Sequence, residues 1–411
     1  MRRFCQKMAC VVNAFILVAL AAALYMDRVL PDTYSVVAGE QITFRYPVTM
    51  VQNARQTDAR VYASPGNTYQ MDLKLMGAIQ VKTVEINVVD RKVVVVSGRP
   101  FGIKMFTDGL MVVGTSDVPY NGTRVNPAKE AGIQVGDILL SLDGTKLLTN
   151  EQLGELVDKA GTTPVRLQVR RGGNIFSATV TPVLSQGDGR HRIGVWVRDS
   201  SAGIGTMTYY DPNSGLFTGL GHAVCDVDTG DVMPLSNGEI VQAQIVGVKR
   251  GASGSPGELK GKFVQNGTMG TLLSNTTSGV YGVLGGRTEP YTQGIQMPLA
   301  MSHEVKVGRA VIYTTLEGDR PREYTVEIEK VMLGDATNGQ NMVVRVTDPV
   351  LLEKTGGIVQ GMSGSPIVQN GMLVGSVTHV FVNDPTRGFG IFAENIQNNA
   401  YSALNRIQNA A

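Results

Sequence analysis

The longest apolar run of the chain lies near its N-terminus. It extends from Met8 to Met26, is broken only by Asn13, and follows three basic residues. A run of this length can cross a bilayer, and basic residues before it keep the N-terminus cytoplasmic. No A-x-A cleavage site follows it. We therefore interpret residues 1–26 as an uncleaved signal-anchor and not as a cleaved signal peptide. The chain is therefore predicted to be membrane-anchored, secreted or both, with its body outside the cytoplasm.

Beyond this segment, apolar and polar residues alternate in short runs that turn residues separate. Residues 81–88 and 93–96 are typical of strands because β-branched residues dominate them. Residues 151–159 and 396–407 instead place their apolar residues at helical spacing. The pattern predicts a mainly β protein in which residues 27–96 form a β-rich spacer.

Composition limits the classes of function. The length of 411 residues suits two to three domains. The net charge of +2 and the lack of a Lys/Arg-rich block argue against a nucleic-acid partner. Two of the three cysteines lie in the first ten residues, which leaves Cys225 without a disulfide partner in the body, and no Cys/His cluster indicates zinc. We expect neither a metal nor a cofactor.

Residues 126–139 carry a recognisable helix and turn pattern. Pro127 suits the first turn of a short helix, Gly132 ends it, and a Gly-Asp turn then leads into an apolar strand. This pattern resembles the signature of PDZ domains, which bind an extended peptide by adding it to a sheet edge. We assign a PDZ domain to residues 97–184.

The resemblance also implies a peptide-binding loop. The stretch from Pro100 to Met105 resembles the loop and strand that receive a peptide C-terminus, which assigns peptide binding to Phe101, Gly102 and Ile103. The alternative is a PDZ-like fold that only packs against its neighbour and binds no peptide.

Residues 186–411 are rich in Gly, Thr, Val and Ser and in turn signals, which favours an all-β barrel or a pair of barrels. Within them, residues 361–366 (GMSGSP) have the G-x-S-G-x-P shape of chymotrypsin-like serine peptidases. The nucleophile of such an enzyme lies on a tight turn that exposes its hydroxyl. Ser363 is therefore the predicted nucleophile, and the N–H groups of Gly361 and Ser363 are the predicted oxyanion hole.

The same pattern occurs a second time, at residues 251–256. Charged and turn-like residues follow Pro256, whereas the sequence after Pro366 predicts a strand, a hairpin turn and a second strand. We interpret Ser253 as part of a surface loop.

A serine nucleophile needs a base, and the chain has four histidines. His191 lies in a basic linker and His303 in a polar stretch. His379 lies on an apolar strand, where a core histidine is the simpler interpretation. His222 follows a glycine and precedes Ser363 by far enough for two barrels to supply one partner each. His222 is therefore the predicted base.

The sequence pattern does not decide which carboxylate would orient His222. Asp226 and Asp228 are so close to His222 in sequence that a role in a turn is the simpler interpretation. Asp335 and Asp348 are the other candidates, and Asp348 follows a strong strand that could deliver it to a barrel interface.

Two stretches resemble one family of peptidases. They run from Ile193 through His222 to Gly230 and from Gly361 to Pro385. With the anchor and the PDZ signature before them, they are similar to the stage IV sporulation protein B peptidases, the S55 family. The resemblance covers nearly the whole chain. It implies a chymotrypsin-like double β-barrel with the catalytic residues His222, Asp348 and Ser363.

The family also implies a biological setting. Its members are exported into the space between the two forespore membranes and cut themselves. They then cut a membrane-bound regulator that restrains an intramembrane metalloprotease, which releases a late sigma factor. The resemblance therefore predicts a protein substrate, self-cleavage and a membrane contact through the N-terminal segment.

Two other classes of protein remain open. A PDZ adaptor with an inactive peptidase domain would bind partners without cutting them. An HtrA-type quality-control protease would carry its protease domain before the PDZ domain, which is the reverse of the order here.

Overall fold

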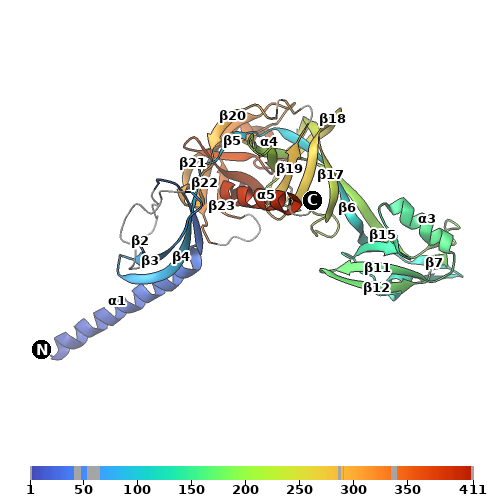
Figure 1. Cartoon of the computed structure of the whole chain (residues 1–411), viewed down its shortest axis with the longest axis horizontal. Coiled ribbons are helices and arrows are strands. Elements are labelled where there is room, and N and C mark those ends of the chain that lie inside the picture. Colours follow the sequence, from blue (N-terminus) through green and yellow to red (C-terminus); the bar gives the residue numbers. More distant parts are fainter. Residues whose placement is uncertain are drawn as a thin grey trace.

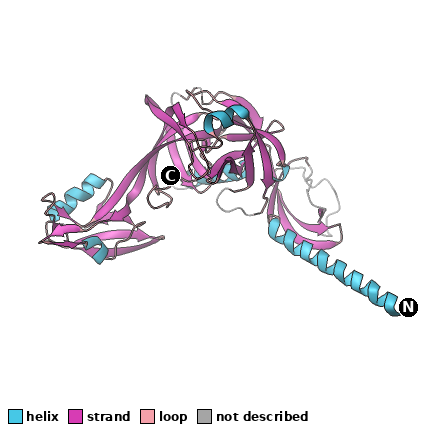
Figure 2. Cartoon of the chain, turned by 180° about the vertical axis from the view of Figure 1, so that it is seen from behind, coloured by secondary structure: helices cyan, strands magenta, loops and turns pink. Residues whose placement is uncertain are grey.

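The computed structural model describes residues 2–40, 48–52, 65–285, 288–289, 291–334 and 340–408 of the chain. Three parts lie in a row (Figure 1). A helix and a small sheet form the N-terminal end, two β-barrels form the middle, and a third unit with its own helices forms the far end. Strands dominate the molecule (Figure 2). The predicted fold class, mainly β, is confirmed.

The N-terminal part joins a long helix to a four-stranded sheet. Helix α1 (Arg2–Val29) contains a stretch, Cys10–Val29, that is long and apolar enough to cross a membrane. Only 6% of that stretch is buried inside the protein, which fits a membrane anchor or a signal sequence. The end of the helix packs on the sheet through Met26 and Leu30. The sheet has the order β1 (Thr33–Val37), β4 (Ile79–Val89), β3 (Thr68–Leu75) and β2 (Val48–Gln52).

Six antiparallel strands form the first barrel. Their order is β6 (Pro100–Thr115), β17 (Leu235–Lys249), β18 (Glu258–Thr276), β19 (Gly279–Leu284), β16 (Leu216–Gly219) and β15 (Val195–Tyr210). Strand β15 pairs again with β6, which closes the ring. Inside the ring, Phe101 and Phe217 meet edge to face with their centroids 5.5 Å apart. Two further strands, β5 (Val93–Val96) and β20 (Ile295–Pro298), extend this sheet beyond β15.

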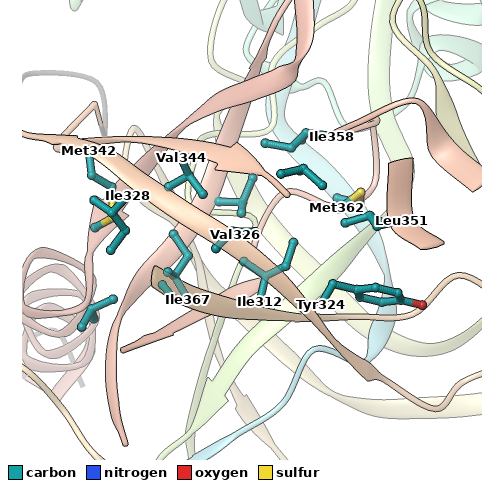
Figure 3. Packing of buried hydrophobic residues seen from close by; sticks show 14 of the residues in the cluster. Ile312, Tyr324, Val326, Ile328, Met342, Val344, Leu351, Ile358, Met362 and Ile367 are labelled. Carbon is teal, nitrogen blue, oxygen red and sulfur yellow. The ribbon is translucent and has the colours of Figure 1, made fainter. Parts of the chain in front are cut away.

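The second barrel also has six strands. Their order is β21 (Gly308–Thr314), β22 (Arg322–Val331), β23 (Met342–Val346), β26 (Asp384–Phe392), β25 (Met372–Phe381) and β24 (Pro366–Gln369). Figure 3 shows its interior, where Ile312, Val326 and Val344 of the strands meet Leu351 of helix α4 (Pro349–Thr355). Helix α5 (Ala393–Gln408) follows the last strand. The predicted pair of barrels, the hairpin after Pro366 and the C-terminal helix are confirmed.

The far unit is built on the extensions of β6 and β15. We call residues 108–198 the PDZ unit. Its sheet adds strands β9 (Ile138–Leu142), β11 (Val165–Arg171) and β12 (Asn174–Val180), and its helices are α2 (Pro127–Glu130) and α3 (Asn150–Ala160). Short pairs complete it: β7 (Val118–Tyr120) with β8 (Thr123–Val125), β10 (Thr145–Lys146) with β9, and β13 (Val183–Leu184) with β14 (His191–Arg192).

The structure divides the chain differently from the predicted boundaries at 97–184 and 186–411. The first half of β6 belongs to the first barrel, and the first residues of β15 belong to the PDZ unit. The PDZ unit is thus inserted into the peptidase domain. The predicted spacer, residues 27–96, likewise ends in β5, which pairs with barrel strands. Alternation of side chains shows that a strand exists but not that two units share it.

The assignment of peptide binding to Phe101, Gly102 and Ile103 is corrected by the same observation. Phe101 and Ile103 are buried in the first barrel. A Cβ at Gly102 would lie 2.5 Å from the ring of Phe263 and 2.6 Å from Val241, so a side chain does not fit there. These residues form part of the barrel core and lie outside the PDZ unit.

Two phenylalanines of β6 test this placement. Phe101 is fully buried and Phe106 is 47% exposed on the same strand. We expect Phe101→Ala to lower the free energy of unfolding by about 3–5 kcal/mol, because it leaves a cavity in the barrel. Phe106→Ala, the matched control, should change it by less than about 1 kcal/mol. Urea unfolding of the full chain in detergent measures both. Equal effects of the two changes would contradict the placement.

Candidate active site

A cavity of about 870 Å³ is lined by residues of both barrels. His222, which follows β16, lines it from the first barrel. Ser363, which precedes β24, and His379 of β25 line it from the second barrel. The structure therefore brings together His222, Ser363 and Gly361 from stretches that are distant in the sequence.

Ser363 lies on the tight turn that its sequence predicts. Gly361 has a φ of +92°, a conformation that favours glycine. The N–H of Ser365 donates to the carbonyl of Met362 and closes the turn (2.9 Å). The hydroxyl of Ser363 donates to the carbonyl of Thr378 (2.7 Å) and not to a histidine. The Ser363 hydroxyl therefore has to leave this carbonyl before it can donate to a histidine.

Two backbone N–H groups beside this hydroxyl are available to an oxyanion. In the described part of the chain, neither the N–H of Gly361 nor that of Ser363 has a hydrogen-bond acceptor. The carbonyl of Gln360 accepts from the N–H of Leu259 (2.8 Å). A trans peptide bond points its N–H opposite to its carbonyl, so this bond directs the Gly361 N–H away from Leu259. The predicted oxyanion hole stays a proposal, and this geometry agrees with it.

The imidazole of His222 has a defined tautomer. Its Nδ1 lies 2.7 Å from the carbonyl oxygen of Ala223. Since a carbonyl only accepts, Nδ1 carries the proton and Nε2 is left as an acceptor. Burial lowers the pKa of His222, and the hydrogen bond to Ala223 opposes this in part. His222 is therefore neutral at pH 7 with Nε2 ready to take a proton.

His379 lies beside His222 in the cavity, and the interpretation of a core histidine is wrong. The two ring centroids are 4.8 Å apart. The residue as a whole is exposed, but its ring packs in the cavity, and this burial together with the charge of His222 lowers its pKa to about 4. The pairing of β25 with β26 shifts register between Val377 and Val380. A register shift of this kind is invisible to side-chain alternation, so no sequence signal pointed to His379.

Asp348 does not lie in this cavity. It caps helix α4, where one carboxylate oxygen accepts from the N–H groups of Val350 (2.9 Å) and Leu351 (3.0 Å). Its other oxygen faces the N–H of Thr325 at 3.3 Å. The strand before Asp348 is present as predicted, but it delivers the carboxylate to a helix N-terminus.

The other carboxylate candidates are also accounted for. Asp226 lines the cavity, but its carboxylate accepts from the N–H of Asp228 in a turn and pairs with Arg198. Asp228 also pairs with Arg198. Asp335 lies outside the described residues. In the described part of the chain, the carbonyl of Ala223 occupies the position at Nδ1 of His222 where a carboxylate was predicted.

The second G-x-S-G-x-P stretch is an exposed turn between β17 and β18, as predicted. The hydroxyl of Ser253 donates to the carbonyl of Asn383 (2.8 Å). We call residues 360–365, which carry the predicted nucleophile, the nucleophile loop. The residues after the exposed turn hold this loop, because the N–H of Gln360 donates to the carbonyl of Gly257 (2.9 Å). Ser253 itself does not line the cavity, whereas Pro256 does.

A second cavity, of about 220 Å³, marks a groove in the PDZ unit. Leu153 and Val157 of α3 form one wall, and residues 193–197 form the other. Residues 195–198 of β15 pair with β6 along one edge, and in the described part of the chain no strand pairs with the other edge of these four residues. An unpaired strand edge beside a helix is the arrangement that receives a peptide strand. The sequence assignment missed this groove because it took β6 for the receiving strand.

Comparison with known proteins found short matches to curated sequences. A protein of Clostridium perfringens described as a zinc metalloprotease is 34% identical over 70 residues, which are 17% of this chain and 21% of that protein. Serine protease HTRA1 of Xenopus tropicalis is 38% identical over 56 residues, 14% of this chain and 12% of that protein. The chain covers less than a quarter of the length of these relatives.

Solved structures resemble the chain only distantly. The inactive form of the Rv3671c protease of M. tuberculosis has a TM-score of 0.30 at 14% identity and covers 49% of this chain and 84% of its own. The HtrA-type protease AlgW with a decapeptide also has a TM-score of 0.30, at 13% identity, and covers 54% of this chain and 58% of its own.

Family models match the two functional parts directly. A PDZ domain model matches residues 125–171, which lie within the PDZ unit. The model of the SpoIVB peptidase S55 matches residues 189–397, just over half of the chain, and includes both His222 and Ser363. The family resemblance of the sequence is confirmed by this match. The chain belongs to the SpoIVB peptidase S55 family of serine peptidases.

Proposed function

We propose that the protein is a serine endopeptidase in which Ser363 is the nucleophile and His222 is its base. The observation that carries the proposal is that one cavity is lined by Ser363, by His222 and by Gly361, and that among the described residues Nε2 of His222 and the N–H groups of Gly361 and Ser363 have no hydrogen-bond partner. These are the three components that acyl transfer requires.

The reaction begins when the Ser363 hydroxyl leaves the carbonyl of Thr378 and turns toward Nε2 of His222. His222 takes the proton while the oxygen attacks the peptide carbonyl, and the N–H groups of Gly361 and Ser363 stabilise the oxyanion. His222 then gives the proton to the leaving amine. The charged imidazole keeps its Nδ1 hydrogen bond to Ala223, which holds the ring in place throughout.

The surroundings of the cavity fit a protein substrate. Aliphatic residues make up nearly half of its lining, among them Ile204, Leu220, Val359 and Val380. We infer that an extended segment with apolar side chains binds there. The groove beside β15 supplies a docking site for a second segment of the same substrate.

Family membership supports a finer proposal. The protein is tethered by α1, acts outside the cytoplasmic membrane, cuts itself and cuts a membrane-bound regulator of an intramembrane metalloprotease during sporulation. The exposed apolar helix agrees with the tether. Mass spectrometry of the N-terminus of the mature protein, and cleavage of the purified regulator, test these steps.

A pair of serine variants tests the nucleophile. We expect Ser363→Ala to abolish peptide hydrolysis and labelling by a fluorophosphonate, because it removes the hydroxyl that attacks the substrate. Ser253→Ala, the control from the second copy of the motif, should leave both near the wild-type level, since Ser253 lies outside the cavity. Labelling of Ser363→Ala, or loss of activity from Ser253→Ala alone, would overturn the assignment. A wild-type chain that is neither labelled nor active would favour the inactive adaptor.

The pH dependence of turnover tests the base. Only neutral His222 accepts a proton, and burial holds its pKa below 6.5, so kcat/KM should rise with pH through a midpoint below 6.5. His379→Ala removes a ring that covers His222, and the midpoint should then move up toward 6.5. Measurement of kcat/KM between about pH 4 and pH 8 gives both midpoints. A wild-type midpoint above 6.5 is incompatible with this site.

Asp348→Asn separates the family triad from the geometry of the structure. The amide oxygen of Asn can still accept from Val350 and Leu351, so the helix cap survives. We expect kcat within about tenfold of wild type, because Asp348 lies outside the cavity. Asp348→Ala should lower stability by about 1 kcal/mol through loss of the cap. A fall of about 10⁴ in kcat for Asp348→Asn would show that this carboxylate orients His222 in the active enzyme.

A further inference from the structure

The loop that carries His222 is a long hairpin that two side chains hold. We call residues 222–233 the His222 loop. At its base, the side-chain amide of Asn275 bonds the N–H and carbonyl of Val224 (2.8 and 2.9 Å) and the carbonyl of Met233 (3.0 Å). At its tip, one carboxylate oxygen of Asp226 accepts from the N–H groups of Asp228 and Thr229, both at 3.0 Å. Asn275 of the first barrel therefore holds the two ends of the loop, while the turn at the tip depends on Asp226.

The partner of Asp226 comes from the PDZ unit. The guanidinium of Arg198, in β15, lies 2.5 Å from the free carboxylate oxygen of Asp226 and 2.7 Å from a carboxylate oxygen of Asp228. The side chain of Asp226 has no exposed surface, whereas that of Asp228 is 54% exposed. A buried carboxylate that loses its cation is costly, so the Arg198–Asp226 pair is the stronger of the two constraints.

A second contact joins the same two parts. A Cβ placed on Gly136 of the PDZ unit would lie 3.0 Å from the carboxylate of Asp231 in the His222 loop. The PDZ unit thus abuts the tip of the loop at two places. Neither contact involves the nucleophile.

The strand that carries Arg198 also reaches the nucleophile loop. Further along β15, the hydroxyl of Thr206 donates to the carbonyl of Gly361 (2.8 Å), and its N–H donates to the carbonyl of Ser363 (3.1 Å). The same strand lines the peptide groove at Val195–Val197. One strand therefore contacts the groove, the His222 loop and the nucleophile loop in turn.

We propose that Arg198 is a positioning residue for His222, so that the PDZ unit contributes to the catalytic machinery and does not only dock substrate. This rests on the proposed function of His222 as the base. Arg198 touches neither substrate nor reacting atoms. It holds the tip of the loop through Asp226. The loop in turn holds Nε2 of His222 in the position relative to the Ser363 hydroxyl that proton transfer requires.

The test compares four variants of the full chain in detergent with a short peptide substrate. Arg198→Ala removes both ion pairs. Asp226→Asn keeps an oxygen for the two N–H groups of the turn but removes the charge that Arg198 binds. Arg198→Lys keeps the charge. Arg91→Ala is the control, because Arg91 is a similarly buried arginine that binds Glu40 and Glu304 and does not line the cavity.

We expect kcat to fall at least tenfold in Arg198→Ala and Asp226→Asn with KM within about twofold, because displacement of a catalytic group by about 1 Å costs up to 10². Arg198→Lys should recover part of kcat, and Arg91→Ala should keep it. The proposal is overturned if Arg198→Ala retains kcat within about threefold of Arg91→Ala, if only KM changes, or if Arg198→Lys recovers nothing. If Arg198→Ala does not fold, the nearly isosteric Asp226→Asn decides.

Hydrogen exchange separates this proposal from the proposed function. The backbone amides of residues 224–233 should exchange faster in Arg198→Ala than in wild type, while those of the second barrel keep their rates. This measurement needs no turnover. Inactive wild-type protein with a protected loop would refute the peptidase assignment alone, and an unchanged loop in Arg198→Ala would refute the role of Arg198 alone.

Discussion

The pairing of β6 with β15 is the interaction on which the other parts of the structure depend. It closes the first barrel at one end and forms the groove-side edge of the PDZ sheet at the other. At the barrel end, β15 supplies through Thr206 the backbone and side-chain donors that hold the nucleophile loop. Loss of register here would displace side chains by one position and exchange the two faces of both units.

Backbone carbonyls take the roles that side chains have in many serine peptidases. The carbonyl of Ala223 holds Nδ1 of His222, and that of Thr378 holds the hydroxyl of Ser363. A carbonyl carries no net charge, so it raises the pKa of the imidazole less than a carboxylate would. Burial is the largest influence on the pKa of both histidines and lowers both values. The imidazole of His222 is therefore neutral at pH 7.

The sequence was sufficient for features that local physics determines. The turn at Ser363, the helix after Pro127 and the C-terminal helix follow from glycine, proline and periodicity, and all are present. Features that depend on pairing between distant strands were not predictable. Phe101 follows the same alternation whether β6 serves a barrel or a PDZ unit, and His379 lies in a stretch of β25 where the pairing with β26 shifts register. Asp348 shows that a strand can end at the expected place and deliver its carboxylate to a helix cap.

The insertion of the PDZ unit has a mechanical consequence. A domain joined by one linker can swivel about it, but this unit is joined by two hydrogen-bonded strands that cross together. A paired ribbon bends across its face far more easily than it twists or stretches. The ribbon therefore acts as a hinge that can bend but does not let the unit swivel freely. A single break in the backbone of either strand would leave the unit attached through the other, so limited proteolysis would loosen this hinge without releasing it.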